Sequence, residues 1–201
     1  MTNTKYGGAV DTDLIDSTSA TALNTYSDEL ITFTDNQGNP ATQAWYRING
    51  VFDTGTSVLE NVESLLTCCD SWMAYNAAQG QWSIVVNKAE NASLYFDDNN
   101  IIGDIRVSTV DINQTVNQIE AKFPSKLNKD IPDYVYLETP SNLLYPNEPI
   151  NKYTTEFALL NDSVQAQYLA NRVLEQARED LTITIATTYY GIQANAGDVV
   201  A

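Results

Sequence analysis

Apolar residues recur at intervals of three and four in three segments of the chain, which is the spacing of helices that bury one face. The first of these segments spans residues 17–30 and has a thin apolar stripe, with Ser17 or Thr18 placed to cap its first turn. The stripe consists of Ala20, Leu23, Ser27 and Leu30. We therefore expect a short helix near the N-terminus, with one narrow buried face.

The other two periodic segments have stronger signals. Ser57 and Glu60 form an S-x-x-E capping box, which marks the start of a helix. Its apolar face is predicted to run through Val58, Val62, Leu65, Leu66, Cys69, Trp72 and Met73. The last helix is predicted over residues 163–180, with Asp162 or Ser163 as its N-cap. Its face consists of Ala166, Leu169, Ala170, Val173, Leu174 and Ala177.

Alternating, β-branched and aromatic segments predict strands around these helices. The predicted strands cover residues 30–34, 44–52, 72–76, 81–87, 91–96, 105–110, 115–123, 133–137, 154–158 and 181–187, and another strand begins at 199–200. Turn residues lie between many of them, at 6–8, 35–40, 53–55, 78–80, 97–100 and 196–198. Prolines are expected to separate strands at Pro124, Pro132 and Pro140, and residues 138–150 are expected to form an extended surface connection.

This order of elements predicts an α+β fold, in which a small helix-on-sheet domain precedes a β-rich domain with one long helix. Residues 1–43 are predicted to be an N-terminal segment with a short helix. Residues 44–90 are predicted to be an α+β unit with the order strand, helix, strand, strand. Residues 91–201 are predicted to form the β-rich part, with its helix near 163–180. Because the sequence stops inside a predicted strand, we expect the chain to be a fragment truncated at its C-terminal end.

The net charge of the chain argues against some classes of function. The chain has 201 residues, with 10 Lys plus Arg against 26 Asp plus Glu and a net charge of −16. Nucleic-acid binding and binding to anionic membranes both need the opposite sign, so neither is expected. No apolar run approaches the ~18 residues of a membrane span, so membrane insertion is not expected, and the first ten residues have no signal-peptide core.

Catalytic chemistry has little support in the sequence. Histidine is absent, which excludes Ser–His–Asp and Cys–His nucleophiles and every histidine-based metal site. Neither G-x-S-x-G nor a phosphate-binding glycine loop occurs. A glycosidase needs two facing carboxylates, and with 26 acidic residues the sequence selects no pair. We expect no enzyme activity and no cofactor.

Metal binding and disulfide formation are also not expected. One acidic cluster, Asp11, Asp13 and Asp16, fails the EF-hand pattern because Ile15 occupies the fifth position. A second cluster, Asp97, Asp98 and Asp104, surrounds a predicted turn. Cys68 and Cys69 are adjacent, a poor geometry for a disulfide, and are expected to be small residues on the second helix with at least one facing the core.

Tyrosines are the candidate binding residues. The chain has 12 Tyr and 3 Trp, and both residue types are enriched at interface anchors. The candidate interface residues are Tyr134, Tyr136, Tyr145, Tyr189 and Tyr190. Core and cross-strand packing in a β domain is the competing explanation for these residues.

Three stretches of the sequence, read together, resemble one family. The first is residues 2–8 (TNTKYGG) followed by 13–16 (DLID). The second is residues 46–54 (YRINGVFDT), which leads into Val58-Leu59-Glu60-Asn61-Val62, Leu65-Leu66, Trp72-Met73-Ala74-Tyr75 and Gly80-Gln81-Trp82. The third is residues 163–178 (SVQAQYLANRVLEQAR), followed by Leu181-Thr182-Ile183 and Gly197-Asp198-Val199-Val200. In this set the chain resembles the central tail-tip, or tail hub and tip attachment, proteins of long-tailed bacteriophages and prophages.

The resemblance implies a structural role. Proteins of that family are longer than this chain, trimerise around the tail axis and close the distal end of the tail tube. It therefore implies a scaffold for tail assembly and host attachment in the virion, made in the bacterial cytoplasm. The implied partners are other tail proteins and, in the full-length assembly, two further copies. Two alternatives stay open: a receptor- or carbohydrate-binding module of a phage particle, and a hydrolase that acts on the cell wall.

Overall fold

A computed structural model describes residues 1–5, 7–35, 37–109, 111–178 and 181–201 of the chain. The helices are α1 (Ser17–Asp28), α2 (Val58–Thr67) and α3 (Ser163–Gln176), with short 3₁₀ helices η1 (Thr12–Leu14), η2 (Lys126–Asn128), η3 (Ser141–Leu143) and η4 (Tyr189–Gln193). The strands are β1 (Leu30–Thr34), β2 (Pro40–Ala44), β3 (Ser71–Asn76), β4 (Gln81–Val86), β5 (Ile101–Thr109), β6 (Gln118–Ser125), β7 (Ile131–Glu138), β8 (Lys152–Glu156) and β9 (Leu181–Thr187).

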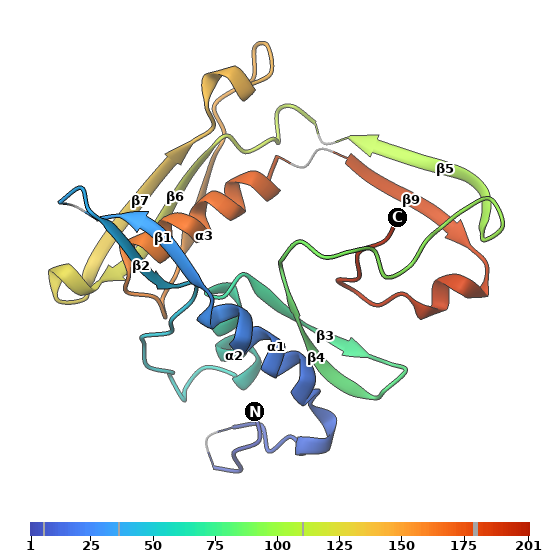
Figure 1. The fold of residues 1–201 in the computed structure, drawn as a ribbon, viewed down its shortest axis with the longest axis horizontal. Coiled ribbons are helices and arrows are strands. Elements are labelled where there is room, and N and C mark those ends of the chain that lie inside the picture. The colour runs from blue at the N-terminus through green and yellow to red at the C-terminus, as the bar shows by residue number, and fades with distance from the viewer. Residues whose placement is uncertain (6, 36, 110, 179–180) are drawn as a thin grey trace.

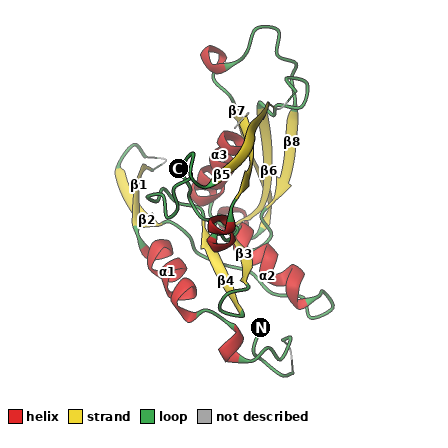
Figure 2. Cartoon of the chain, turned by 90° about the vertical axis from the view of Figure 1, so that its right-hand side faces the viewer, coloured by secondary structure: helices red, strands yellow, loops and turns green. Residues whose placement is uncertain are grey.

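These strands form several small sheets, which confirms the predicted α+β class (Figure 1). In the described residues, β1 pairs with β2, β3 with β4, and β5 with β9, each as an antiparallel two-stranded sheet. The largest sheet has the order β7-β6-β8, in which β6 is antiparallel to β7 and parallel to β8. Helix α3 lies against one face of this sheet (Figure 2).

The contact between α3 and β6 forms the centre of the core. Strand β6 alternates strictly, and it turns Ile119, Ala121 and Phe123 toward the helix. The helix presents its predicted face, and Ala166 and Ala170 are completely buried. The same buried cluster includes residues from before and after position 90: Leu23, Tyr46, Leu66, Cys68, Cys69, Phe157, Leu159, Leu160, Leu169 and Leu174. The division at residues 43 and 90 stays a prediction.

Helix α2 begins as the sequence predicts, because both hydrogen bonds of the Ser57–Glu60 capping box are present. Its predicted end was wrong. The helix stops at Thr67, and Asp70 takes a left-handed φ of 48°, which turns the chain into β3. The later part of the predicted stripe, Trp72 and Met73, therefore lies on β3.

The strand predicted over residues 44–52 was also wrong, since only Ala44 belongs to a strand. The backbone amides that follow donate to separate elements: Trp45 N to Glu29 O (2.9 Å), Tyr46 N to Ser27 O (3.3 Å) and Asn49 N to Leu159 O (2.9 Å). Tyr46 is buried in the core. Hydrogen bonds to separate elements therefore replace the strand pairing that the alternating pattern predicted.

Pro124 and Pro132 do not separate strands, contrary to the prediction, but lie opposite each other in β6 and β7. Neither proline has an N–H, so this position suits a pair that exchanges no ladder hydrogen bonds. On its other side, β6 pairs with β8 only as far as Lys122. No described strand on that side therefore requires a hydrogen-bond donor from Pro124.

Several boundaries also differ from prediction. Helix α1 is capped by Asp16, whose carboxylate accepts from Thr18 N, because Ser17 and Thr18 are already helical. Segments 91–96 and 199–200 form only an isolated bridge between Leu94 and Val200. Strand β5 begins four residues before the predicted strand. Helix α3, capped by Asp162, ends at Gln176. Tyr6, Asn36, Val110 and residues 179–180, which belong to predicted elements, lie outside the described residues.

Replacing Phe123 tests the position of the core. Phe123→Ala removes a side chain that is 1% exposed and is expected to lower the free energy of unfolding by about 3–5 kcal/mol. Tyr136→Ala, on the outer face of the same sheet, is expected to cost about 1 kcal/mol. Urea denaturation followed by circular dichroism measures both variants, and equal losses would contradict this assignment of the buried face.

Candidate assembly surfaces

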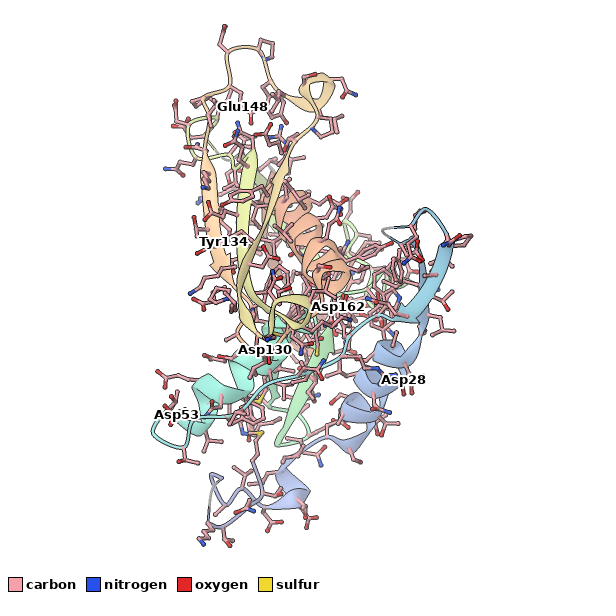
Figure 3. All side chains as sticks on the ribbon, turned by 90° about the vertical axis from the view of Figure 1, so that its left-hand side faces the viewer. Asp28, Asp53, Asp130, Tyr134, Glu148 and Asp162 are labelled. Atoms are coloured by element: carbon pink, nitrogen blue, oxygen red, sulfur yellow. The ribbon has the colours of Figure 1, made fainter. Side chains whose placement is uncertain are left out.

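The outer face of the three-stranded sheet carries two of the predicted tyrosines. Tyr134 and Tyr136 occupy alternate positions on β7 that point away from α3, and Figure 3 labels the first of them. Their rings are 6.1 Å apart and nearly parallel, at 23°. The ammonium group of Lys152 lies 5.4 Å from the centroid of the Tyr136 ring. The ring faces are therefore turned toward each other and toward a cation.

Ion pairs surround these rings on the same face. Lys122 pairs with Glu156 at 3.0 Å, and Lys152 pairs with Glu120. Their carboxylate partners raise the pKa of both lysines above the ordinary value. Because positive charges offset the carboxylates, this face is close to neutral on a chain whose net charge is −16. The face is mixed in polarity, as protein–protein interfaces are outside their centres.

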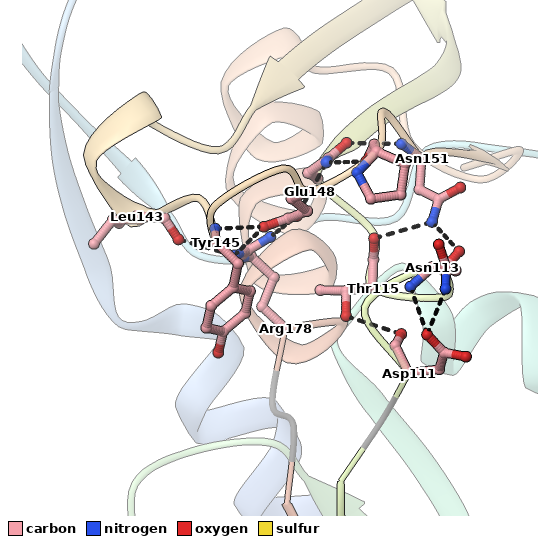
Figure 4. Close-up of polar contacts among 10 residues, drawn as sticks. Asp111, Asn113, Thr115, Leu143, Tyr145, Glu148, Asn151 and Arg178 are labelled. Atoms are coloured by element: carbon pink, nitrogen blue, oxygen red, sulfur yellow. Dashed lines mark hydrogen bonds and ion pairs between the residues drawn. The ribbon is translucent and has the colours of Figure 1, made fainter.

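Tyr145 lies in a different place, on the connection between β7 and β8 (Figure 4). Its ring lies 5.6 Å from the guanidinium of Arg178, just beyond the end of α3. Arg178 donates to both carboxylate oxygens of Glu148, at 2.7 and 3.2 Å, and to Leu143 O at 2.9 Å. These contacts of Arg178 hold the β7–β8 connection against the end of α3.

Glu148 is the centre of that group, and its side chain is only 1% exposed. It also accepts hydrogen bonds from Tyr145 N (2.8 Å) and from the Asn117 amide (3.0 Å). The bond from Arg178 makes the largest contribution to lowering the pKa of Glu148 to about 2, against the cost of burial. A buried carboxylate with a charged partner and two further donors is fully ionised and satisfied at neutral pH.

Tyr189 and Tyr190 lie in η4, directly after β9. The Tyr189 side chain is 90% exposed, whereas the edge of the Tyr190 ring packs against Phe96 with centroids 5.8 Å apart. The five predicted tyrosines therefore occupy three separate locations. Among the ring contacts of the described residues, Tyr134 and Tyr136 are the only two of the five that touch each other.

A polar depression at the start of α3 was not predicted as a site. It measures about 360 Å³, and its walls include Arg47, Lys126 and Asp162. Asp162 accepts from Val164 N, Gln165 N and the Gln43 amide, and it pairs with Lys126. Burial opposes ionisation of Asp162, but the Lys126 and Gln43 bonds hold its pKa below the ordinary value. Of the described residues that line this depression, Asp162 is the one carboxylate, so a catalytic pair is not formed there.

Three members of the acidic clusters have local structural roles. Asp11 accepts from Asp13 N in η1, Asp16 caps α1, and Asp97 accepts from Asn99 N in a turn. In the part of the chain that the structure describes, no three Asp, Glu, Cys or His side chains are grouped to hold a metal ion. None of the described helices is long and apolar enough to cross a membrane.

The two cysteines follow α2 and do not lie on it, contrary to the prediction, although both are buried. Burial raises the pKa of both thiols, that of Cys69 to about 12. Thiols in this state are poor nucleophiles at neutral pH. The cysteines therefore contribute to packing.

Comparison with solved structures finds chains that this one resembles in fold. A chain from the virion of a native gene transfer agent particle superposes with a TM-score of 0.50 and 11% identity, over 81% of this chain and 44% of that one. The tail protein from Neisseria meningitidis MC58 gives a TM-score of 0.43 and 14% identity, over 72% of this chain and 41% of that one. This chain thus spans less than half the length of either. No family model and no curated protein matches it.

The Glu148–Arg178 pair leads to a prediction on pH. The pKa of Glu148 is about 2 in the folded chain and near the ordinary glutamate value of 4.5 when unfolded, so the folded state binds fewer protons between these values. The pair therefore stabilises the fold above about pH 5, and that contribution is lost as the pH falls toward 2. Glu148→Gln is expected to cost about 2–4 kcal/mol at pH 7 and to flatten the acid dependence of stability.

Glu156→Gln is the matched control, since it removes a carboxylate from an ion pair in which Glu156 is 57% exposed. It is expected to change the free energy of unfolding by less than about 1 kcal/mol. Urea titrations at a series of pH values between 2.5 and 7 measure both variants. A Glu148→Gln variant with wild-type stability and acid dependence would contradict the proposed role of the buried pair.

Proposed function

We propose that this chain is a structural component of a phage tail tip or baseplate hub, which serves as a scaffold for tail assembly and host attachment. The observation that carries the proposal is its fold, which is similar over 81% of the chain to a protein in a gene transfer agent virion. The proposed partners are other tail proteins and, in the full-length assembly, two further copies. The proposed location is the virion, after synthesis in the bacterial cytoplasm.

The surface chemistry supports an assembly role. The outer face of the β7-β6-β8 sheet is close to neutral and carries paired charges, and Tyr134 and Tyr136 lie on its outer strand β7. Ring stacking and ion pairs restrict some of these side chains before a partner binds, which reduces the entropy cost of binding. Several described carboxylates, among them Asp16, Glu148 and Asp162, are engaged in caps and ion pairs, and we propose that the chain has no catalytic role.

The geometry of the tyrosines weighs against the carbohydrate-binding alternative. A sugar ring stacks on an aromatic face that is open to solvent. The rings of Tyr134 and Tyr136, which are 44% and 63% exposed, stack on each other, and Lys152 lies over Tyr136, so part of their face area is already covered. Tyr145 and Tyr189 do not extend this pair of rings, since they lie elsewhere in the described chain.

Localisation in purified particles tests the proposal. Particles from a host that carries the gene are purified on a density gradient, then analysed by peptide mass spectrometry and by gold-labelled antibody against the chain. We expect its peptides to co-purify with tail proteins and the gold to label one end of the tail. Antibody pre-adsorbed with the purified chain is the control, and particles that lack the chain would contradict the proposal.

A binding assay distinguishes the alternative function. The purified chain is passed over immobilised cell-wall polysaccharide, with Tyr136→Ala and Tyr189→Ala as a matched pair of variants. We expect no retention of the wild-type chain. Retention that is lost in Tyr136→Ala but kept in Tyr189→Ala would favour a carbohydrate-binding module on the outer sheet face.

A further inference from the structure

Asn49 and Gly50 form the one Asn–Gly sequence of the chain. They lie in the segment 45–52, which forms no strand in the described structure. In such a sequence the backbone nitrogen of the second residue is able to attack the side-chain carbonyl carbon of the asparagine. A glycine favours this attack, because it has no Cβ to obstruct the approach and its backbone is free to adopt the required conformation. Whether the attack occurs depends on how accessible the two groups are in the folded chain.

Both reacting groups are accessible. Asn49 and Gly50 are exposed. Among the hydrogen bonds of the described residues, none engages the Asn49 side chain and none is donated by the backbone amide of Gly50. By contrast, Asn117 is buried, and its side chain donates to Glu148 and to Pro149 O. The fold therefore leaves the Asn49 carbonyl carbon and the Gly50 nitrogen free to react.

A contact with Leu159 explains why a glycine stands at position 50. A Cβ added to Gly50 would lie 2.6 Å from Leu159 Cδ2 and 3.1 Å from Leu159 Cα, which is too close for a larger residue. The preceding amide, Asn49 N, donates to Leu159 O at 2.9 Å. Leu159 itself belongs to the buried core. Packing therefore requires the residue that makes Asn49 reactive.

Positive charges share a depression with this asparagine. Asn49 lines the polar depression at the start of α3 together with Arg47 and Lys126. The attack builds up negative charge, first on the Gly50 nitrogen as it loses its proton and then on the side-chain oxygen of Asn49. Cations placed toward such a charge stabilise the transition state. The depression therefore favours the reaction and also the carboxylate that the reaction forms.

We propose that Asn49 is a site of spontaneous deamidation. The Gly50 nitrogen bonds to Asn49 Cγ, the Cγ–Nδ2 bond breaks, and ammonia leaves with the proton that the Gly50 nitrogen gives up. Water then opens the resulting five-membered succinimide. Addition of water at Cγ gives aspartate at position 49, and addition at the main-chain carbonyl carbon gives isoaspartate. The net reaction exchanges ammonia for water and needs no oxidant, reductant or cofactor.

The two products affect the fold differently. Aspartate keeps the main chain and adds one negative charge to the depression that holds Arg47 and Lys126. Isoaspartate adds one carbon atom to the main chain between the nitrogens of residues 49 and 50. The hydrogen bond to Leu159 O and the close fit of Gly50 on Leu159 are then no longer compatible. The isoaspartyl form therefore weakens the attachment of segment 45–52 to the core, and this inference does not rest on the proposed tail role.

Peptide mass spectrometry of the purified, folded chain tests the proposal. Samples are incubated at neutral and at mildly alkaline pH and digested at intervals. Asn91 is the internal control, since it is exposed and lies outside helices and strands but is followed by Ala92. We expect the peptide with residue 49 to gain the mass of a deamidation and to split into aspartyl and isoaspartyl forms, faster at the higher pH. Its rate should exceed that of Asn91 at least about tenfold, which is about 1.4 kcal/mol in activation free energy.

Two variants with an exposed, conservative change supply the matched comparison. Asn49→Gln keeps the amide but requires a larger ring for the attack, and Asn49→Asp reproduces one product. On ion exchange, aged wild type is expected to yield a more acidic species that elutes with fresh Asn49→Asp, and Asn49→Gln is expected to yield none. Urea denaturation is expected to show lower stability for aged than for fresh wild type, and no change on ageing of Asn49→Gln. Circular dichroism establishes that each fresh variant is folded.

The outcomes that overturn the proposal are distinct. A residue 49 that deamidates no faster than Asn91, or an acidic species that forms at the wild-type rate in Asn49→Gln, would overturn the site. Isoaspartate at position 49 without any loss of stability would overturn the inferred effect on the contact with Leu159. The proposed function fails separately, by absence of the chain from purified particles.

Discussion

Helix α3 lies with two completely buried alanines, Ala166 and Ala170, against the central strand of the three-stranded sheet. Small side chains let the helix approach β6 closely, and the larger Ile119 and Phe123 fill the space around them. The rest of the described core is arranged around this contact, since residues from the N-terminal third pack against the same cluster. A change that separates α3 from β6 would therefore expose the whole core.

Polar contacts along the same helix connect it to the rest of the chain. Gln165, completely within the core, donates to Cys68 O and accepts from Arg47 N. Farther along, Arg172 pairs with Asp70 at 3.2 Å. Beyond the helix end, Arg178 holds Glu148. These three sets of contacts fix the position of α3 relative to segments about 30 to 120 residues away in sequence. In each set the buried polar group has a hydrogen-bond partner, which makes its burial tolerable.

The elements that depend on local signals could be predicted from the sequence. The capping box of α2, the β3–β4 hairpin, the alternation of β9 and the apolar face of α3 all appear as predicted. The incorrect predictions share one cause: contacts between residues far apart in the sequence override the local sequence pattern. Residues 45–52 alternate like a strand, but their amides bond to α1 and to Leu159. Glu148 and Arg178 are 30 residues apart, and no local pattern pairs them. Of the candidate site, the sequence indicated the tyrosines but not their separation into three locations.

The described chain consists of a body held by α3 and a ribbon, β5–β9, whose strands make substantial contacts only with each other. Amide hydrogen exchange in dilute solution tests this division most directly. The account predicts that the amides of β6 are strongly protected, whereas those of β9 exchange faster. Amides of β9 that are protected as strongly as those of β6 in dilute solution would contradict it.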